Sequence, residues 1–301
     1  MNNGKVNWKG SFPAAVTPFK KDGEIDKEKF ITNLELMLSE GAGGFVISGC
    51  CGECWSLTAE ERIYLFKTAV DVVGGRVPVI GGTENIRTEN VIALSKEAKR
   101  AGVDGVMIIA PYFAEVNKEA VIAHYKAIAE EVNVPIMLYN HPPSNNINLD
   151  VSYLNRLVDL EWVVAIKESS GNVSQVMDAL AAVGDKILVF TGYSARVGMP
   201  CVLLGSPGFV GAMEPQIMGK EGFDLFRLSY ERKIDEAWKV QKRTMRCSKG
   251  VGAIGSSPAN LKAAMNMLGR PGGFCRRPII ELSKHEEDLV RNILVELNLL
   301  R

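Results

Sequence analysis

The amino-acid sequence predicts an α/β protein in which eight parallel strands form a (β/α)8 TIM barrel, with an appended C-terminal helical bundle. Short apolar, β-branched runs recur at regular spacing, and segments of helical periodicity separate them. This alternation is typical of a parallel sheet covered by helices. An open doubly wound sheet is the alternative, but no GxGxxG motif opens a helix after a strand. The barrel is therefore favoured.

The individual elements follow from these runs. The expected strands are Phe12–Thr17, Gly44–Ser48, Val77–Gly81, Gly105–Ala110, Pro135–Asn140, Val163–Glu168, Leu188–Thr191 and Phe209–Gly211. The expected helices between them include Lys27–Glu40, Ala59–Val73, Thr88–Ala101, Lys118–Val132 and Val173–Val183. Glycines at Gly41–Gly44 and Gly102–Gly105 end helices just before a strand. Eight such units span roughly 200 residues, as a barrel of this kind requires.

Beyond the last strand, the periodicity is only helical. The expected helices there are Phe223–Ser248, Pro258–Leu268 and Lys284–Leu300, separated by loops at Gly250–Ser257 and Gly269–Pro278. No linker rich in proline, glycine and serine separates them from the barrel. We therefore expect a catalytic barrel over residues 1–222 and a helical extension over residues 223–301 that packs on it.

Composition excludes several classes of function. The chain has 301 residues, is 47% hydrophobic, and carries 35 basic and 35 acidic side chains. Zero net charge gives no electrostatic reason to expect nucleic acid or a membrane surface as partner. No apolar run is long enough to span a membrane, and Met1–Trp8 has no apolar segment of signal-peptide type. We expect a cytoplasmic protein.

Cysteines raise the question of a metal. Cys50, Cys51 and Cys54 crowd into one short segment, where they could bind a metal or a cluster. No second CxxC motif or histidine pair completes a four-ligand set. The cysteines that show no ligand spacing are Cys201, Cys247 and Cys275. We expect no metal, no cofactor and no structural disulfide.

Lys167 is the most informative residue. It ends the apolar run Trp162–Ile166, in the tetrapeptide Ala165–Glu168. Burying an unpaired ammonium costs several kcal/mol, which is relieved when the pKa falls. A neutral lysine amine is a nucleophile that condenses with ketones and aldehydes. The alternative is a lysine that ends a strand with its ammonium in water.

The C-terminal strand ends, where barrels of this kind place their chemistry, carry other candidate residues. The turn Gly49-Cys50-Cys51-Gly52-Glu53 can bring backbone N–H groups close to a carboxylate. The further candidates for contact with a substrate are Tyr139, Asn140, His141, Gly208, Phe209 and Val210. The C-terminal end of the barrel would thus bring together a lysine, a tyrosine and an anion-binding turn. This combination suits an enzyme that condenses with a carbonyl compound.

Taken together, these motifs resemble those of a known enzyme family. The chain resembles the family of dihydrodipicolinate synthase and N-acetylneuraminate lyase, the class I pyruvate-type Schiff-base aldolases. The likeness covers nearly the whole chain and includes Phe12–Phe19, Gly49–Glu53, Ser56–Glu61, Tyr139–Asn140, Ile166–Gly171, Pro258–Lys262 and Arg277–Leu282. It implies that Lys167 forms the imine and Tyr139 transfers protons. It also implies a 2-keto acid substrate held at the Cys50-Cys51 turn, and a homotetramer built from tight dimers.

The departures from the family bear on the substrate. Cys50 and Cys51 stand where the family carries serine or threonine, and a thiol is a weak hydrogen-bond donor. Tyr112 corresponds to an aromatic residue that the family has at its subunit interface. Phe113, however, stands where the synthases have a second tyrosine, which they contribute across the dimer interface. The stretch Pro142–Asn146 lacks the arginine with which the synthases bind a second carboxylate group. We therefore expect a divergent member rather than a true dihydrodipicolinate synthase.

Two residues near the mouth have alternative interpretations. Arg196 follows the seventh strand, where sialate lyases carry acidic residues. Its guanidinium group could bind a distal carboxylate through two hydrogen bonds. The alternative for Arg196 is a solvated surface residue. His141 could act as an acid–base group or a substrate ligand. The alternative for His141 is a rim histidine bonded to a carbonyl group.

Three hypotheses for function follow. The first is a class I Schiff-base lyase acting on pyruvate or a longer 2-keto acid, which makes or breaks a carbon–carbon bond. The second keeps the imine but dehydrates, decarboxylates or deaminates a keto-acid derivative. The third is a non-catalytic paralogue on the same scaffold, because a fold does not fix a function. A metal-dependent aldolase is a fourth possibility, disfavoured by the missing ligand cluster.

Overall fold

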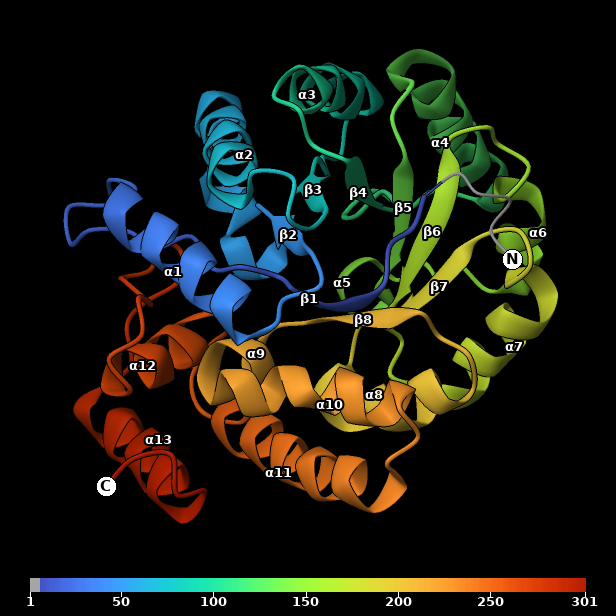
Figure 1. Ribbon diagram of the computed structural model, residues 1–301. Helices are drawn as coiled ribbons and strands as arrows, with labels where there is room; N and C mark the ends of the chain where they lie inside the picture. The colour runs from blue at the N-terminus through green and yellow to red at the C-terminus, as the bar shows by residue number, and fades with distance from the viewer. Residues whose placement is uncertain (1–5) are drawn as a thin grey trace.

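Eight parallel strands form a barrel in the computed structural model, which describes residues 6–301 (Figure 1). The strand order is β1-β8-β7-β6-β5-β4-β3-β2, and a parallel bridge between Ala14 and Val46 joins the first two strands to close the ring. The strands are β1 (Gly10–Pro13), β2 (Phe45–Ile47), β3 (Val79–Gly82), β4 (Gly105–Ile109), β5 (Ile136–Asn140), β6 (Val163–Glu168), β7 (Leu188–Thr191) and β8 (Gly208–Gly211). The predicted fold class is confirmed.

An outer ring of helices covers the barrel (Figure 1). Its helices are α1 (Lys27–Glu40), α2 (Ala59–Val73), α3 (Thr88–Arg100), α4 (Lys118–Val132), α6 (Val151–Leu157), α7 (Val173–Val183), α8 (Ser194–Leu203) and α10 (Lys220–Tyr230). Local sequence fixes where they begin. Asp26 and Asn117 cap α1 and α4, and Thr58 forms a capping box with Glu61 at the start of α2.

The C-terminal helices differ from the prediction in two respects. The expected helix Phe223–Ser248 is two helices, α10 and α11 (Ile234–Gly252), separated by a turn in which Arg232 has a φ of 57°. Helix α11 also runs into the expected loop Gly250–Ser257. Helix α10 packs against α8 and β1, so it belongs to the ring around the barrel. The ring therefore extends past residue 222, and the division into two domains stays a prediction.

Short helices connect or follow the strands. They are α5 (Pro142–Asn145), α9 (Met213–Met218), η1 (Cys50–Gly52) and η2 (Cys54–Ser56). The remaining C-terminal helices are α12 (Ala259–Met267) and α13 (Lys284–Glu296), which pack with α11 around a shared apolar cluster. That cluster includes Val16, which directly follows the first strand region. The extension and the barrel thus share a core.

Side-chain alternation along the strands decides what enters the barrel. Met137 and Tyr139 on β5, and Ala165 on β6, belong to the apolar cluster inside the barrel. Residues two positions apart on a strand lie on the same face, which directs Lys167 inward as well. Leu138 and Ile166 belong instead to the cluster between the sheet and the helices.

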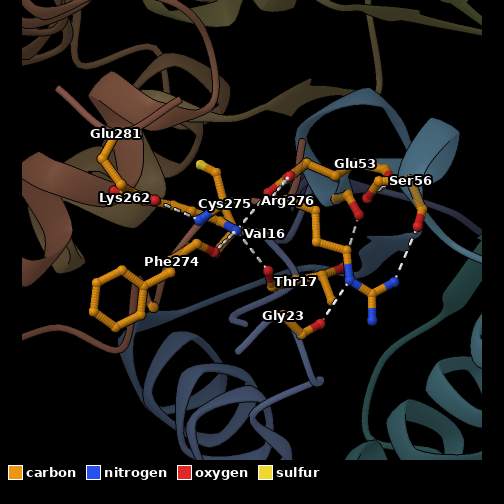
Figure 2. Close-up of polar contacts among 12 residues, drawn as sticks. Val16, Thr17, Gly23, Glu53, Ser56, Lys262, Phe274, Cys275, Arg276 and Glu281 are labelled. Atoms are coloured by element: carbon orange, nitrogen blue, oxygen red, sulfur yellow. Dashed lines mark hydrogen bonds and ion pairs between the residues drawn. The ribbon is translucent and has the colours of Figure 1, made fainter. Parts of the chain in front are cut away.

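A buried polar network ties the C-terminal extension to the turn after β2 (Figure 2). Lys262 on α12 is fully buried and forms an ion pair with Glu53, which is also fully buried. The Lys262 ammonium also donates to the carbonyl oxygens of Thr17 and Phe274, at 2.7 and 2.6 Å. The backbone N–H of Arg276 donates to the other Glu53 oxygen at 2.9 Å. Glu53 is therefore held from several directions.

None of the helices described between residues 6 and 301 is long and apolar enough to cross a membrane. Part of the segment Met1–Trp8, from which we expect no signal peptide, lies outside the described residues.

Replacing Lys262 by alanine should lower the free energy of unfolding by about 3–5 kcal/mol, because it leaves the Glu53 carboxylate buried without a partner. Urea unfolding followed by circular dichroism measures this change. Lys284→Ala is the matched control, since that lysine is 75% exposed and its ion pairs lie at the surface. Equal, small effects in the two variants would contradict the assigned role of Lys262.

Candidate active site

A cavity of about 690 Å³ lies at the C-terminal ends of the strands. It is lined by seven of the residues predicted from sequence, namely Lys167, Tyr139, Cys50, Cys51, His141, Arg196 and Val210. Helix α11 also contributes to the wall, through Ser248, Lys249 and Gly252. The C-terminal extension is therefore part of the cavity as well as a support for the barrel.

Lys167 lies near the end of β6, beside Tyr139 on the neighbouring strand β5. Its Nζ is 4.1 Å from the centroid of the Tyr139 ring. The residue is only 7% exposed, so the interpretation of Lys167 as a solvated strand end does not hold. Burial lowers the pKa of the Lys167 amine below its ordinary value. The arrangement favours the neutral, nucleophilic amine.

The turn after β2 presents backbone donors to the cavity. Its closing hydrogen bonds run from the N–H groups of Gly52 and Cys54 to the carbonyl oxygen of Gly49, at 2.9 and 3.3 Å. The N–H groups of Cys50 and Cys51 take no backbone partner in the described chain. Because both residues line the cavity, these N–H groups are available to an anion there.

The thiols of this turn have different environments. The Cys50 side chain packs against the apolar cluster that includes Tyr139. Interaction with the Cys54 thiol, aided by the nearby charge of Lys167, lowers the pKa of Cys50. Burial raises the pKa of Cys51 to about 11. Burial also raises the pKa of Tyr139, so its phenol is protonated at neutral pH.

His141 opens helix α5 at the cavity wall. Its Nε2 lies 3.1 Å from the Tyr193 hydroxyl, and its Nδ1 hydrogen-bonds the Ser144 hydroxyl. Burial and the charge of Lys167 lower the pKa of His141 to about 4. The imidazole is therefore neutral at pH 7 and can donate from only one ring nitrogen. Its partners are side chains, and not the carbonyl group that the sequence suggested as the alternative.

Four predicted residues lie outside the cavity lining, and strand geometry explains each. Asn140 follows the inward-facing Tyr139, so it faces outward, where its amide bonds Glu168, Asn148 and the N–H of Leu149. Phe209 likewise packs between the sheet and helices α8 and α10. Neither residue is in the cavity lining, and their contact with substrate stays a prediction.

The two glycines among these four serve packing. A Cβ on Gly208 would lie 2.1 Å from the carbonyl oxygen of Gly10, so glycine allows β1 and β8 to pair closely. A Cβ on Gly49 would lie 3.3 Å from the Met107 side chain inside the barrel. Neither position provides room for a ligand in the cavity.

The predicted interface aromatics lie outside this cavity. Phe113 is 95% exposed and has a φ of 67°, in the left-handed region that costs energy for a bulky residue. Tyr112 is half-buried and lines a second cavity between α2 and α3. The role of both residues at a subunit interface stays a prediction.

Sequence reasoning missed Glu214 and Ser194. Both line the cavity, Glu214 is 2% exposed, and the Ser194 hydroxyl donates to its carboxyl group. Burial raises the pKa of Glu214, and no described cationic side chain forms an ion pair with it. Glu214 lies on α9, a helix too short to show periodicity. Its position just after the eighth strand was the signal available in the sequence.

A metal could be held only by a suitable cluster of ligands. Within residues 6–301, no three histidine, cysteine, aspartate or glutamate side chains lie close enough together to hold an ion. The three cysteines of the turn therefore do not form such a group.

Comparison with known proteins agrees with this geometry. The profile of the Dihydrodipicolinate synthetase family matches residues 7–297. The 4-hydroxy-tetrahydrodipicolinate synthase of Oceanobacillus iheyensis is 34% identical over 294 residues, which cover 98% of this chain and 97% of that protein. The synthase of Clostridium novyi is 36% identical over 291 residues, covering 97% of each chain.

Solved structures show the same relationship. A dihydrodipicolinate synthase from Aquifex aeolicus superimposes with a TM-score of 0.91 at 30% identity, covering 97% of this chain and 98% of that one. A dihydrodipicolinate synthase from Acinetobacter baumannii, solved in complex with pyruvate, gives a TM-score of 0.91 at 27% identity and covers 98% and 100%. The family match, these relatives and the buried lysine–tyrosine pair lead to one conclusion: the chain belongs to the dihydrodipicolinate synthetase family and is a class I Schiff-base lyase.

Proposed function

We propose that Lys167 condenses with the ketone of pyruvate or a longer 2-keto acid. The observation that carries this proposal is the buried Lys167 amine against the ring of Tyr139, inside a cavity at the strand ends. The amine attacks the keto carbon, and Tyr139 supplies the proton that lets the carbinolamine hydroxyl leave as water. The resulting iminium withdraws electrons, so a carbon–carbon bond to the adjacent carbon can form or break.

The N–H groups of Cys50 and Cys51 are proposed to hold the carboxylate of the keto acid. They line the cavity and take no backbone partner. Backbone donors work regardless of the side chain, so the cysteines in this turn do not prevent anion binding. The Cys50 side chain packs against the apolar cluster that includes Tyr139.

The second reactant is proposed to be an aldehyde that binds in the same cavity. Glu214, Ser194 and Arg196 are among the residues that line it. The stretch Pro142–Asn146 brings Ser144 rather than an arginine to the wall, and Ser144 is bonded to His141. We therefore propose that this chain uses a different aldehyde from the one its synthase relatives use.

We also propose that the enzyme is a homotetramer and works in the cytoplasm. The exposed ring of Phe113, on a strained backbone position, supports contact with a second copy. The resemblance to tetrameric family members supports the same assembly. The absence of net charge agrees with a small-molecule substrate as the ligand rather than a nucleic acid.

Replacing Lys167 by alanine should abolish covalent trapping of pyruvate, because its amine is the one that lies against the Tyr139 ring among residues 6–301. Incubation with pyruvate and cyanoborohydride, followed by intact mass measurement, should show one adduct on the wild-type protein and none on Lys167→Ala. Lys249→Ala is the matched control, since Lys249 is the other lysine in the cavity wall. An adduct that survives in Lys167→Ala, or is lost in Lys249→Ala, would contradict the assignment.

The rate of trapping should rise with pH and level off below pH 10.5. Only the neutral amine attacks the ketone, and burial lowers the pKa of Lys167 from that ordinary value. The neutral fraction therefore grows as pH rises through the lowered pKa and is complete before an exposed lysine loses its proton. Initial rates of trapping across a pH series measure the midpoint, and a midpoint at or above 10.5 would contradict the proposal.

A further inference from the structure

Two buried polar residues directly follow the proposed catalytic pair along the chain. Asn140 comes after Tyr139 on β5, and Glu168 comes after Lys167 on β6. The register of the two strands sets Tyr139 opposite Lys167 and sets Asn140 opposite Glu168. Both Asn140 and Glu168 are buried, and neither lines the cavity. The reaction as proposed assigns no role to Glu168.

The Glu168 carboxylate is held by three uncharged donors. The amides of Asn140 and Gln175 donate to one of its oxygens, the second of them at 2.9 Å. The backbone N–H of Ser170 donates to the other oxygen at 2.6 Å. Both oxygens only accept hydrogen bonds, as those of an ionised carboxylate do. Within residues 6–301 no cationic side chain forms an ion pair with Glu168, so hydrogen bonds compensate its burial.

The Asn140 side chain is fixed from its other side. Its amide oxygen accepts from the N–H of Leu149 at 2.8 Å, and its amide nitrogen also donates to Asn148 at 2.9 Å. Asn148 in turn accepts from the Gln175 amide at 2.7 Å. A flipped Asn140 amide would set its NH2 group against the N–H of Leu149, so only one orientation satisfies these partners. The bond from Asn140 to Glu168 therefore has a fixed direction.

Backbone hydrogen bonds join the same strand ends. The N–H of Ser169 donates to the Asn140 carbonyl oxygen at 2.8 Å. The N–H of Gly192, which follows β7, donates to the Glu168 carbonyl oxygen at 2.7 Å. Asn140 and Glu168 thus use both side chain and backbone to hold the ends of β5, β6 and β7 together.

We propose that Glu168 is a positioning residue, which through its bond to Asn140 holds the Lys167 amine against Tyr139 for attack on the ketone. A peptide chain has only two freely rotating backbone bonds per residue, so fixing Glu168 and Asn140 also fixes the residues before them. Those residues are Lys167 and Tyr139, whose Nζ and ring centroid lie 4.1 Å apart on the inner face of the strands. Misplacement of a reacting group by about 1 Å slows a reaction. The inference rests on the function proposed for Lys167.

Glu168→Gln tests this role without changing the volume of the side chain. Its new NH2 group has to face a donor on one side or the other, so at least one of the three hydrogen bonds is lost. The maximum rate of trapping with pyruvate and cyanoborohydride should fall about tenfold, the effect of one lost hydrogen bond to a charged group. The pyruvate concentration that gives half the maximum rate should stay within about twofold, because the turn after β2 still binds the carboxylate. Glu130→Gln, at an exposed ion pair, is the matched control and should trap like the wild-type protein.

A second substitution restores the bond in the opposite direction. Asn140→Asp alone sets two carboxylates against each other and should also slow trapping about tenfold. In the double variant Asn140→Asp/Glu168→Gln, the new carboxylate accepts from the new amide and still accepts from the N–H of Leu149. The amides of Asn148 and Gln175 are not buried and can turn to donate to it. The double variant should regain a rate within about threefold of wild type. Loss of stability alone would lower the amount of protein trapped, and would give no such recovery of rate.

Two results would overturn the inference: a wild-type maximum rate in Glu168→Gln, or a double variant that is no faster than Glu168→Gln. If the wild-type protein traps no pyruvate, the proposed function fails instead, and a crystal structure of Glu168→Gln then decides the role of Glu168. Nζ of Lys167 should be displaced from the Tyr139 ring in that structure, and an unchanged distance of 4.1 Å would overturn the inference.

Gln175→Leu replaces Glu168→Gln if circular dichroism shows that the latter is misfolded. It removes one donor to Glu168 from a half-buried position, which the fold should tolerate. The maximum rate of trapping should fall about threefold, because water replaces part of a hydrogen bond at such a position. An unchanged rate in this variant would contradict the role of Glu168.

Discussion

The ion pair between Lys262 and Glu53 is the contact on which the rest of the site depends (Figure 2). It joins a helix near the end of the chain to a turn near its beginning, and both charges are removed from water. Such a pair is costly to form unless its remaining hydrogen-bonding positions are filled. Here the carbonyl oxygens of Thr17 and Phe274 and the N–H of Arg276 fill them. The position of the turn is thereby fixed.

This constraint sets the geometry of the proposed chemistry. Glu53 is the last residue of the turn, so holding its carboxylate fixes the segment that carries the N–H groups of Cys50 and Cys51 at the cavity. The barrel positions the other two groups of the proposed site, because strand alternation places Lys167 and Tyr139 on the inner face of adjacent strands. A rigid turn opposite a rigid pair is what an imine-forming site requires, since misplacement by about 1 Å costs reaction rate.

Much of this could be predicted from sequence, for identifiable reasons. Runs of apolar residues gave the strands, and the strand ends gave Lys167 and Tyr139. Asn140 and Phe209 were predicted from proximity to a strand end alone, although the alternation that points Tyr139 inward points Asn140 outward. Glu214 was missed because α9 is too short to show a period.

A crystal structure of the protein soaked with pyruvate tests the central claim most directly. The account predicts continuous density from Nζ of Lys167 to the keto carbon, with the carboxylate against the N–H groups of Cys50 and Cys51. The Tyr139 hydroxyl should lie within hydrogen-bond distance of the new bond. Pyruvate bound without a covalent link to Lys167, or with its carboxylate against Arg196, would contradict the account.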